Sequence, residues 1–183
     1  MANALLDPAT PEQLAERGQA IETEGKLEDF RRLAQIVERD LAALPGSDDA
    51  WRRAPVAIRL GFGWADARRR VPALQGHAAA DLTTICQRCL EPFRLHVETD
   101  LNLLLMRSGG TSDGHEEYEV WEHDEETLRP VDIVEEALIM ALPLAAMHAS
   151  PDDCGVLVRA SADNDVDVAR PFAGLRSLLE NSD

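Results

Sequence analysis

The most constraining feature of this sequence is a long run of alternating residues that begins at Phe93 and ends at Leu105. One set in the run is mostly apolar: Phe93, Leu95, Val97, Thr99, Leu101, Leu103 and Leu105. The intervening set is polar: Arg94, His96, Glu98, Asp100 and Asn102. Because successive side chains of a strand point to opposite faces, this pattern predicts an antiparallel strand with one buried and one hydrated face.

Other stretches with a period of two lie on both sides of this strand. Residues 56–60 alternate between large apolar and polar or small side chains, which predicts a half-buried strand from Pro55 onward. A further strand is expected over residues 78–86, with a turn before it at Gln75-Gly76. Residues 118–121 predict a short edge strand. These segments together indicate a sheet of several strands.

Three stretches have the signals of helices. Thr10-Pro11 begins a short helix, in which Gln13 closes a capping box with Thr10. A longer amphipathic pattern covers residues 27–41. Residues 132–142 predict a well-buried helix, with Asp132 as its N-cap and an end enforced by Pro143. The predicted fold class is therefore α+β: an antiparallel sheet, one able to close toward a barrel, with a packed helix and peripheral N-terminal helices.

The length of 183 residues predicts one compact domain. Residues 1–50 are expected to form an N-terminal helical segment that packs on the domain. Residues 51–157 are expected to form the α+β core, including a hairpin that carries a C-x-x-C turn. Residues 158–183 are expected to be a mobile linker followed by a short amphipathic segment.

The C-x-x-C turn is formed by Cys86 and Cys89, and the third cysteine, Cys154, lies far downstream behind His148. Zinc prefers four sulfur or nitrogen ligands in tetrahedral geometry, and a C-x-x-C turn supplies two thiolates from one tight loop. The predicted ligands of a structural zinc ion are therefore Cys86, Cys89, His148 and Cys154. Such a site requires the downstream loop to fold against the tip of the hairpin.

Three other interpretations of the cysteines remain open. In the first, the cysteines are buried apolar thiols, which is a common fate of free cysteine. In the second, they form a site that binds metal only in part. Alternatively, Cys86 and Cys89 are the redox pair of a thiol-disulfide oxidoreductase. A hairpin tip lacks the βαβ context of thioredoxin-like enzymes, and Leu90 stands where a tight metal-binding turn often has glycine. Three cysteines with this spacing favour a reducing cytoplasm.

Charge is unevenly distributed along the chain. The net charge of −16 argues against broad, nonspecific binding to nucleic acid, which depends on cations displacing counterions from phosphates. Residues 113–136 are almost wholly acidic, which favours a basic protein partner. A local basic patch would use the arginines that cluster in one stretch, and these are the candidate RNA contacts: Arg52, Arg53, Arg59, Arg68, Arg69 and Arg70.

Motifs of known catalytic families are missing from the sequence. It has no P-loop, no G-x-G-x-x-G after a strand, no H-E-x-x-H and no G-x-S-x-G. Nothing in it pairs a nucleophile with a base, so we expect no enzyme. No apolar run reaches the ~18 to 20 residues that span a bilayer, so we expect no membrane partner.

Four segments of the chain carry a resemblance to a known family. They are Cys86-Gln87-Arg88-Cys89-Leu90-Glu91-Pro92-Phe93, the stretch from Val131 to Leu144, the pair His148 and Cys154, and Pro171-Phe172-Ala173-Gly174-Leu175. In this order they resemble the YceD family, the large ribosomal RNA subunit accumulation proteins. The resemblance covers most of the chain.

The resemblance implies a bacterial, cytoplasmic and non-enzymatic ribosome-biogenesis factor. Such a factor would support the synthesis, processing or stability of 23S rRNA. Its partner would be a pre-ribosomal particle or 23S rRNA, contacted directly or through a basic ribosomal protein. Neither a small-molecule substrate nor a membrane is expected.

Overall fold

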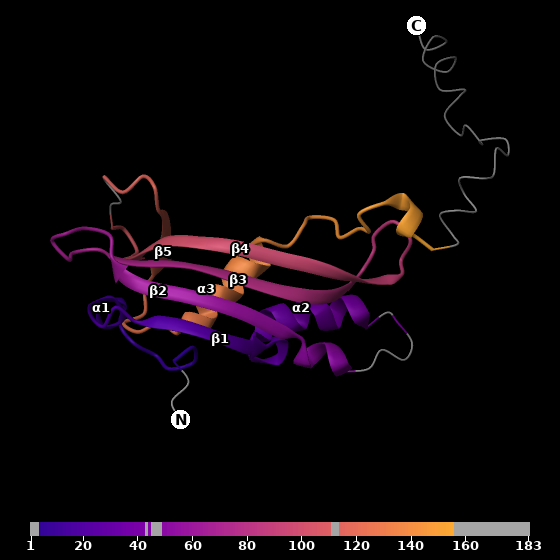
Figure 1. Cartoon of the computed structure of the whole chain (residues 1–183), viewed down its shortest axis with the longest axis horizontal. Coiled ribbons are helices and arrows are strands. Elements are labelled where there is room, and N and C mark those ends of the chain that lie inside the picture. The colour runs from indigo at the N-terminus through magenta and orange to yellow at the C-terminus, as the bar shows by residue number, and fades with distance from the viewer. Residues whose placement is uncertain (1–3, 43, 45–48, 111–113, 156–183) are drawn as a thin grey trace, which may run out of the picture.

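The computed structural model describes residues 4–42, 44, 49–110 and 114–155 (Figure 1). Its framework is a five-stranded sheet in which the spatial order of the strands follows the sequence. The strands are β1 (Ala20–Lys26), β2 (Pro55–Trp64), β3 (Pro72–Ile85), β4 (Pro92–Arg107) and β5 (Glu119–His123). The expected linker and amphipathic segment at residues 158–183 lie outside the described residues.

The predicted α+β class is confirmed, but the barrel is wrong and the sheet is mixed. Strands β1 to β4 form an antiparallel meander, whereas β5 pairs with β4 in parallel. β1 and β5 are the two open edges, so the sheet does not close. The parallel pairing follows from the connection after β4, which returns the chain to the level of Leu103, so that β5 runs beside the last five residues of that strand.

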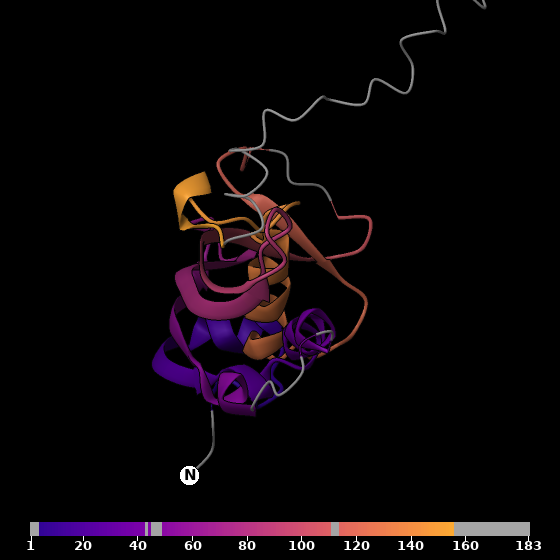
Figure 2. The ribbon, with the colours of Figure 1, turned by 90° about the vertical axis from the view of Figure 1, so that its right-hand side faces the viewer.

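Helices cover one face of the sheet (Figure 2). They are α1 (Pro11–Glu16), α2 (Arg31–Leu41) and α3 (Pro130–Met140), with short 3₁₀ turns η1 (Leu27–Asp29), η2 (Asp49–Arg53) and η3 (Pro151–Asp153). The core lies between these helices and side chains such as Ile58, Leu74 and Leu82. Within the described residues, no helix is long and apolar enough to cross a membrane.

β4 carries the alternation that the sequence predicts. Val97, Leu101 and Leu103 are buried against the helices, while the intervening side chains face solvent. β3 and β4 pair along thirteen residues and end in the tight turn that carries Cys86 and Cys89. This long hairpin holds the C-x-x-C turn at one end of the sheet (Figure 1).

β1 was not predicted from the sequence. Its residues, inside the expected helical segment 1–50, bury only Ile21, so they lack the repeated apolar positions that mark a strand. These residues form a strand because they pair with β2, from Ala20 opposite Gly61 to Lys26 opposite Pro55. The division of the chain into three segments stays a prediction.

The turn expected at Gln75-Gly76 is wrong, because both residues lie inside β3. A Cβ atom at Gly76 would collide with the carbonyl oxygen of Arg59 and approach the Cα of Leu60 to 3.1 Å. Glycine is therefore needed here for the close approach of β2. The reversal occurs earlier, where the Asp66 carboxylate accepts hydrogen bonds from the backbone N–H of Arg70 (2.8 Å) and of Val71 (3.4 Å).

The short helix at Thr10-Pro11 has the predicted capping box, but the start of α3 differs from the prediction. α3 begins at Pro130 with Arg129 at the N-cap, so Asp132 lies in the first turn. The carboxylate of Asp132 instead binds the guanidinium of Arg129, at 2.6 and 2.8 Å. Proline at the first helical position explains the earlier start, because its missing N–H needs no partner there.

A buried carboxylate joins α3 to α2. Glu135 of α3 is 6% exposed. Its Oε1 accepts hydrogen bonds from the backbone N–H of Arg32 (2.6 Å) and of Leu33 (3.3 Å), and its Oε2 accepts one from Arg32 Nε (3.0 Å). These backbone groups belong to the first turn of α2, where a helix has free donors and the positive end of its dipole. Glu135 therefore caps α2 from another helix.

Replacing Glu135→Gln should lower the free energy of unfolding by about 1–3 kcal/mol, because the change removes the charge and places amide N–H donors against Nε of Arg32. Urea unfolding measures this loss. The matched control is Glu136→Gln, since Glu136 binds Arg32 from a more exposed position and should cost less than about 1 kcal/mol. Equal losses for the two variants would show that capping by Glu135 is unimportant.

Candidate metal centre

The first half of the site is the tip of the β3–β4 hairpin. Leu90 N–H donates to the carbonyl of Cys86 (2.8 Å), and Cys86 N–H donates to the carbonyl of Glu91 (2.9 Å). Leu90 has a φ of 61°, in the left-handed region where glycine is favoured. An L-residue there costs roughly 1–2 kcal/mol. The turn that the C-x-x-C spacing needs is therefore present despite its unfavourable residue.

The second half of the site is the chain that follows α3. It crosses the hairpin, and Gln87 N–H donates to the carbonyl of Ala146 (2.8 Å). The ring of His148 packs on the ring of Phe93, with centroids 4.7 Å apart. The 3₁₀ turn η3, capped by Ser150, then directs Cys154 back toward the hairpin.

These two segments bring the four predicted site residues together. The ligand atoms of Cys86, Cys89, His148 and Cys154 all lie within 4.8 Å of one another. We call this group the Cys3His cluster. Nδ1 of His148 is 3.5 Å from Sγ of Cys89 and 3.7 Å from Sγ of Cys154. The three cysteines are buried and free, so the cluster is closed to solvent on the sulfur side.

The spacing of these atoms fits a tetrahedral metal. Zinc bonds of about 2.3 Å to sulfur and 2.0–2.1 Å to nitrogen put neighbouring ligand atoms about 3.6 to 3.8 Å apart. The two distances from His148 Nδ1 agree with this range. Four protein ligands would fill the coordination sphere, so such a centre would be structural and have no open position for a substrate.

Backbone dipoles favour a thiolate at Cys86. Burial of the sulfur raises the pKa, but the backbone N–H groups of His148, Cys89 and Arg88 and the side chain of His148 outweigh it. Together they lower the pKa of Cys86 from 9.0 to about 6. Burial and the neighbouring Cys89 thiol instead raise the pKa of Cys154. The cluster therefore holds at least one sulfur ready to bind a cation near neutral pH.

Two residues that support the cluster were missed by the sequence argument. The guanidinium of Arg88 lies 3.7 Å from Sγ of Cys154 and 3.8 Å from Sδ of Met147. It would offset the negative charge that three thiolates carry around a divalent ion. Phe93 covers His148 and packs on the cysteines. The position of Arg88 inside the C-x-x-C turn was the available signal for its role.

The six arginines proposed as RNA contacts do not form one patch. Arg52 and Arg53 lie in η2, whereas Arg68, Arg69 and Arg70 lie in the turn after β2. The ten residues of β2 separate the two groups by about 30 Å, and the groups lie at opposite ends of the sheet (Figure 1). Arg59 lies between them on the open face.

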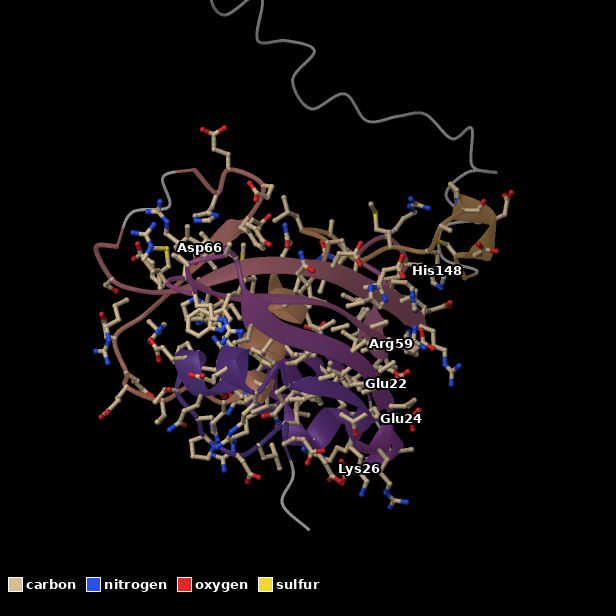
Figure 3. All side chains as sticks on the ribbon, turned by 60° about the vertical axis from the view of Figure 1, so that its left-hand side comes forward. Glu22, Glu24, Lys26, Arg59, Asp66 and His148 are labelled. Atoms are coloured by element: carbon tan, nitrogen blue, oxygen red, sulfur yellow. The ribbon has the colours of Figure 1, made fainter. Side chains whose placement is uncertain are left out.

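Half of these arginines already have partners. Arg52 binds Glu38 (2.6 Å) and stacks on the ring of Trp51. Arg59 binds Glu22 on the adjacent strand (3.0 Å), and both side chains are labelled in Figure 3. Arg70 binds Asp66 (3.5 Å). Arg53, Arg68 and Arg69 have no ion-pair partner among the described residues. Arg94, which was not among the arginines predicted from the sequence, lines a groove of about 480 Å³ together with Arg53.

The fold and the cluster define a class: an α+β protein with a mixed meander sheet and a Cys3His cluster between a hairpin tip and the segment after a helix. The family model for the large ribosomal RNA subunit accumulation protein YceD matches residues 74–179, which include the whole cluster. The match covers more than half of the chain, which therefore belongs to the YceD family. Among solved structures, none matches the chain significantly.

The lowered pKa of Cys86 predicts a pH-dependent signal in protein freed of metal by a chelator. Subtracting the thiolate absorbance of Cys86→Ser from that of the wild type should leave a titration centred near pH 6 rather than near the 9.0 of an ordinary thiol. Because the folded pKa lies below the unfolded one, Cys86 stabilises the metal-free fold fully above pH 9 and loses this effect as the pH falls through 6. A difference signal centred at pH 9 would contradict the backbone-dipole argument.

Proposed function

We propose that this chain is a non-enzymatic ribosome-biogenesis factor that supports the synthesis, processing or stability of 23S rRNA in the cytoplasm. The observation that carries the proposal is the family match, whose description concerns accumulation of large-subunit ribosomal RNA. The structure supplies a scaffold with a closed cluster, and the cysteine sulfurs that contact His148 are buried, so they offer no accessible nucleophile. A role in binding and assembly suits such a molecule better than catalysis.

We also propose that the Cys3His cluster holds a structural zinc ion. Its support is the convergence of one imidazole nitrogen and three sulfurs from segments about sixty residues apart. When bound, the ion would cross-link the hairpin tip to the segment after α3. It would thereby stabilise an end of the sheet where the protein's own apolar contacts are few: the cysteines and Phe93 form a small cluster separate from the main core.

The redox alternative has one favourable observation, the low pKa of Cys86. Two observations oppose it. Cys86 and Cys89 are 0% and 2% exposed, so neither sulfur is accessible to a protein disulfide. The low pKa is also explained by backbone donors of the kind that support metal-bound thiolates. Failure of the protein to reduce insulin would remove the alternative.

Protein purified without chelators should contain about one equivalent of zinc. Removing it should lower the free energy of unfolding by about 4 kcal/mol if free zinc was a thousand times its dissociation constant. His148→Ala should release the metal, whereas His96→Ala, an exposed histidine on β4, should retain it. Metal below about a tenth of an equivalent, with Cys86→Ser as stable as the wild type, would overturn the zinc proposal.

We propose that the chain contacts the pre-ribosomal particle by binding a protein rather than rRNA phosphates. The net charge of −16 repels RNA, and the unpaired arginines are separated along the sheet. Of the six arginines predicted as RNA contacts, Arg53, Arg68 and Arg69 have no ion-pair partner among the described residues, so a direct RNA contact through this set would use them. These three arginines therefore make the sharpest test between the two modes.

Cells depleted of the protein should lose 23S rRNA relative to 16S rRNA, and the wild-type chain should restore it. The triple change Arg53→Glu, Arg68→Glu and Arg69→Glu should restore it within about twofold of the wild type, because no phosphate contacts are lost. The measurement is the ratio of the two rRNAs. Tight binding of purified protein to naked 23S rRNA that falls steeply with salt and vanishes in the triple variant would contradict the protein-mediated mode.

A further inference from the structure

An open groove runs between the β5 edge of the sheet and α3. It has a volume of about 640 Å³ and is lined by residues of β4, β5 and α3. Its floor is apolar: Leu101 and Leu103 are buried, and Trp121 is half-buried. Met140, which is 77% exposed, and Val120, which is 41% exposed, stand at its rim. We call this feature the β5–α3 groove.

The charged residues of the β5–α3 groove are all acidic. They are Asp100, Glu119, Glu122 and Glu136, with no lysine or arginine among the lining residues. Asp100 binds His77 and Glu136 binds Arg32. Glu119 and Glu122 have no ion-pair partner in the part of the chain that the structure describes. Two uncompensated carboxylates therefore flank the apolar residues of the groove, of which Met140 and Val120 are exposed.

The surroundings of the groove extend this charge. Residues 116–126 contain seven acidic residues and no lysine or arginine. The open face of the sheet differs, because it carries basic as well as acidic side chains. Glu22, Arg59, His77 and Asp100 form a row of directly paired positions across four strands, with contacts of 3.0 Å from Arg59 to Glu22 and 2.9 Å from His77 to Asp100. Attraction for a cationic partner is strongest at the β5 edge.

We propose that the β5–α3 groove is the docking site for a lysine- and arginine-rich polypeptide segment that carries a large apolar anchor. The anchor would pack against Trp121 and displace water from the exposed side chains of Val120 and Met140, while cations on either side would meet Glu119 and Glu122. Apolar burial supplies affinity in such an interface, and charge complementarity supplies the rate of association and the choice of partner. This inference rests on the proposed function, in which a basic protein links the chain to the ribosomal particle.

Other occupants fit the groove less well. An RNA strand would bring phosphates against the carboxylates of Glu119 and Glu122. A second copy of this chain would bring another net charge of −16 to the same surface. Binding of RNA is a separate outcome of the test.

Fluorescence anisotropy of the full-length protein tests the docking site with three labelled peptides. KKFLKKLFKK carries charge and apolar anchors, KKSSKKSSKK carries charge alone, and EEFLEELFEE carries the same anchors with the opposite charge. The first should bind at least about tenfold more tightly than either of the others, because docking needs both features. The charge-only peptide accounts for unspecific attraction to an acidic protein.

Two pairs of substitutions locate the binding. Glu119→Gln with Glu122→Gln should weaken KKFLKKLFKK about tenfold. The matched pair, Glu16→Gln with Glu24→Gln, removes the same charge from exposed positions on α1 and β1 and should change it less than about twofold. Met140→Ser should reduce the advantage of KKFLKKLFKK over KKSSKKSSKK. Equal binding of these two peptides, equal effects of the two pairs, or preference of the groove for an RNA oligonucleotide would overturn the proposal.

The chain's own C-terminal segment contains Phe172, Leu175 and two arginines, so it is tested as a competitor. If the wild type fails to bind KKFLKKLFKK but Phe172→Asp with Leu175→Asp binds it, the groove is a site for this segment and the proposal is wrong. Complementation separates the groove from the function. Rescue of 23S rRNA by Glu119→Gln with Glu122→Gln as well as by the wild type would reject the groove alone, whereas failure of the wild type to rescue would reject the proposed function.

Discussion

The carboxylate of Glu135 fixes the position of α3, and the candidate metal centre depends on that position. Through the backbone of Arg32 and Leu33 it ties α3 to the start of α2, on the face of the sheet that carries the core. The segment after Met140 leaves α3 beside the middle of β4 and runs to the end of the sheet where the β3–β4 hairpin turns (Figure 1). From there His148 and Cys154 reach the C-x-x-C turn. A hydrogen-bonded buried charge is costly to disrupt, which makes it suited to fixing one arrangement of two helices.

The elements with strong local signals were predictable from the sequence. The alternation through β4 and the capping box at Thr10 are of this kind, because each pattern encodes its own structure in neighbouring residues. β1 was not predictable, since only Ile21 is buried and the strand exists through pairing with β2. Gly76 was misinterpreted because a glycine in a strand and a glycine in a turn look alike until the neighbouring strand is known.

The site was partly predictable for a similar reason. A C-x-x-C pair with a histidine and a cysteine downstream can be recognised as a possible ligand set from the sequence alone. The six arginines predicted as RNA contacts do not form one patch, because residues on either side of β2 are close in sequence but far apart along the sheet, and their role stays a prediction. The role of Glu135 was hidden because a carboxylate in a helix gives no sign that it caps another helix one hundred residues away. Ligand types and their spacing could be predicted from the sequence, but contacts between residues far apart in the sequence could not.

Metal chemistry and assembly occupy different parts of the molecule in this account: the Cys3His cluster holds the turn of the hairpin, and the acidic β5–α3 groove offers a surface to a partner. X-ray absorption at the zinc edge of the purified protein tests the central claim most directly. The account predicts three sulfur neighbours at about 2.3 Å and one nitrogen at about 2.0 Å. A first shell made mainly of oxygen, or one with fewer than three sulfurs, would contradict it.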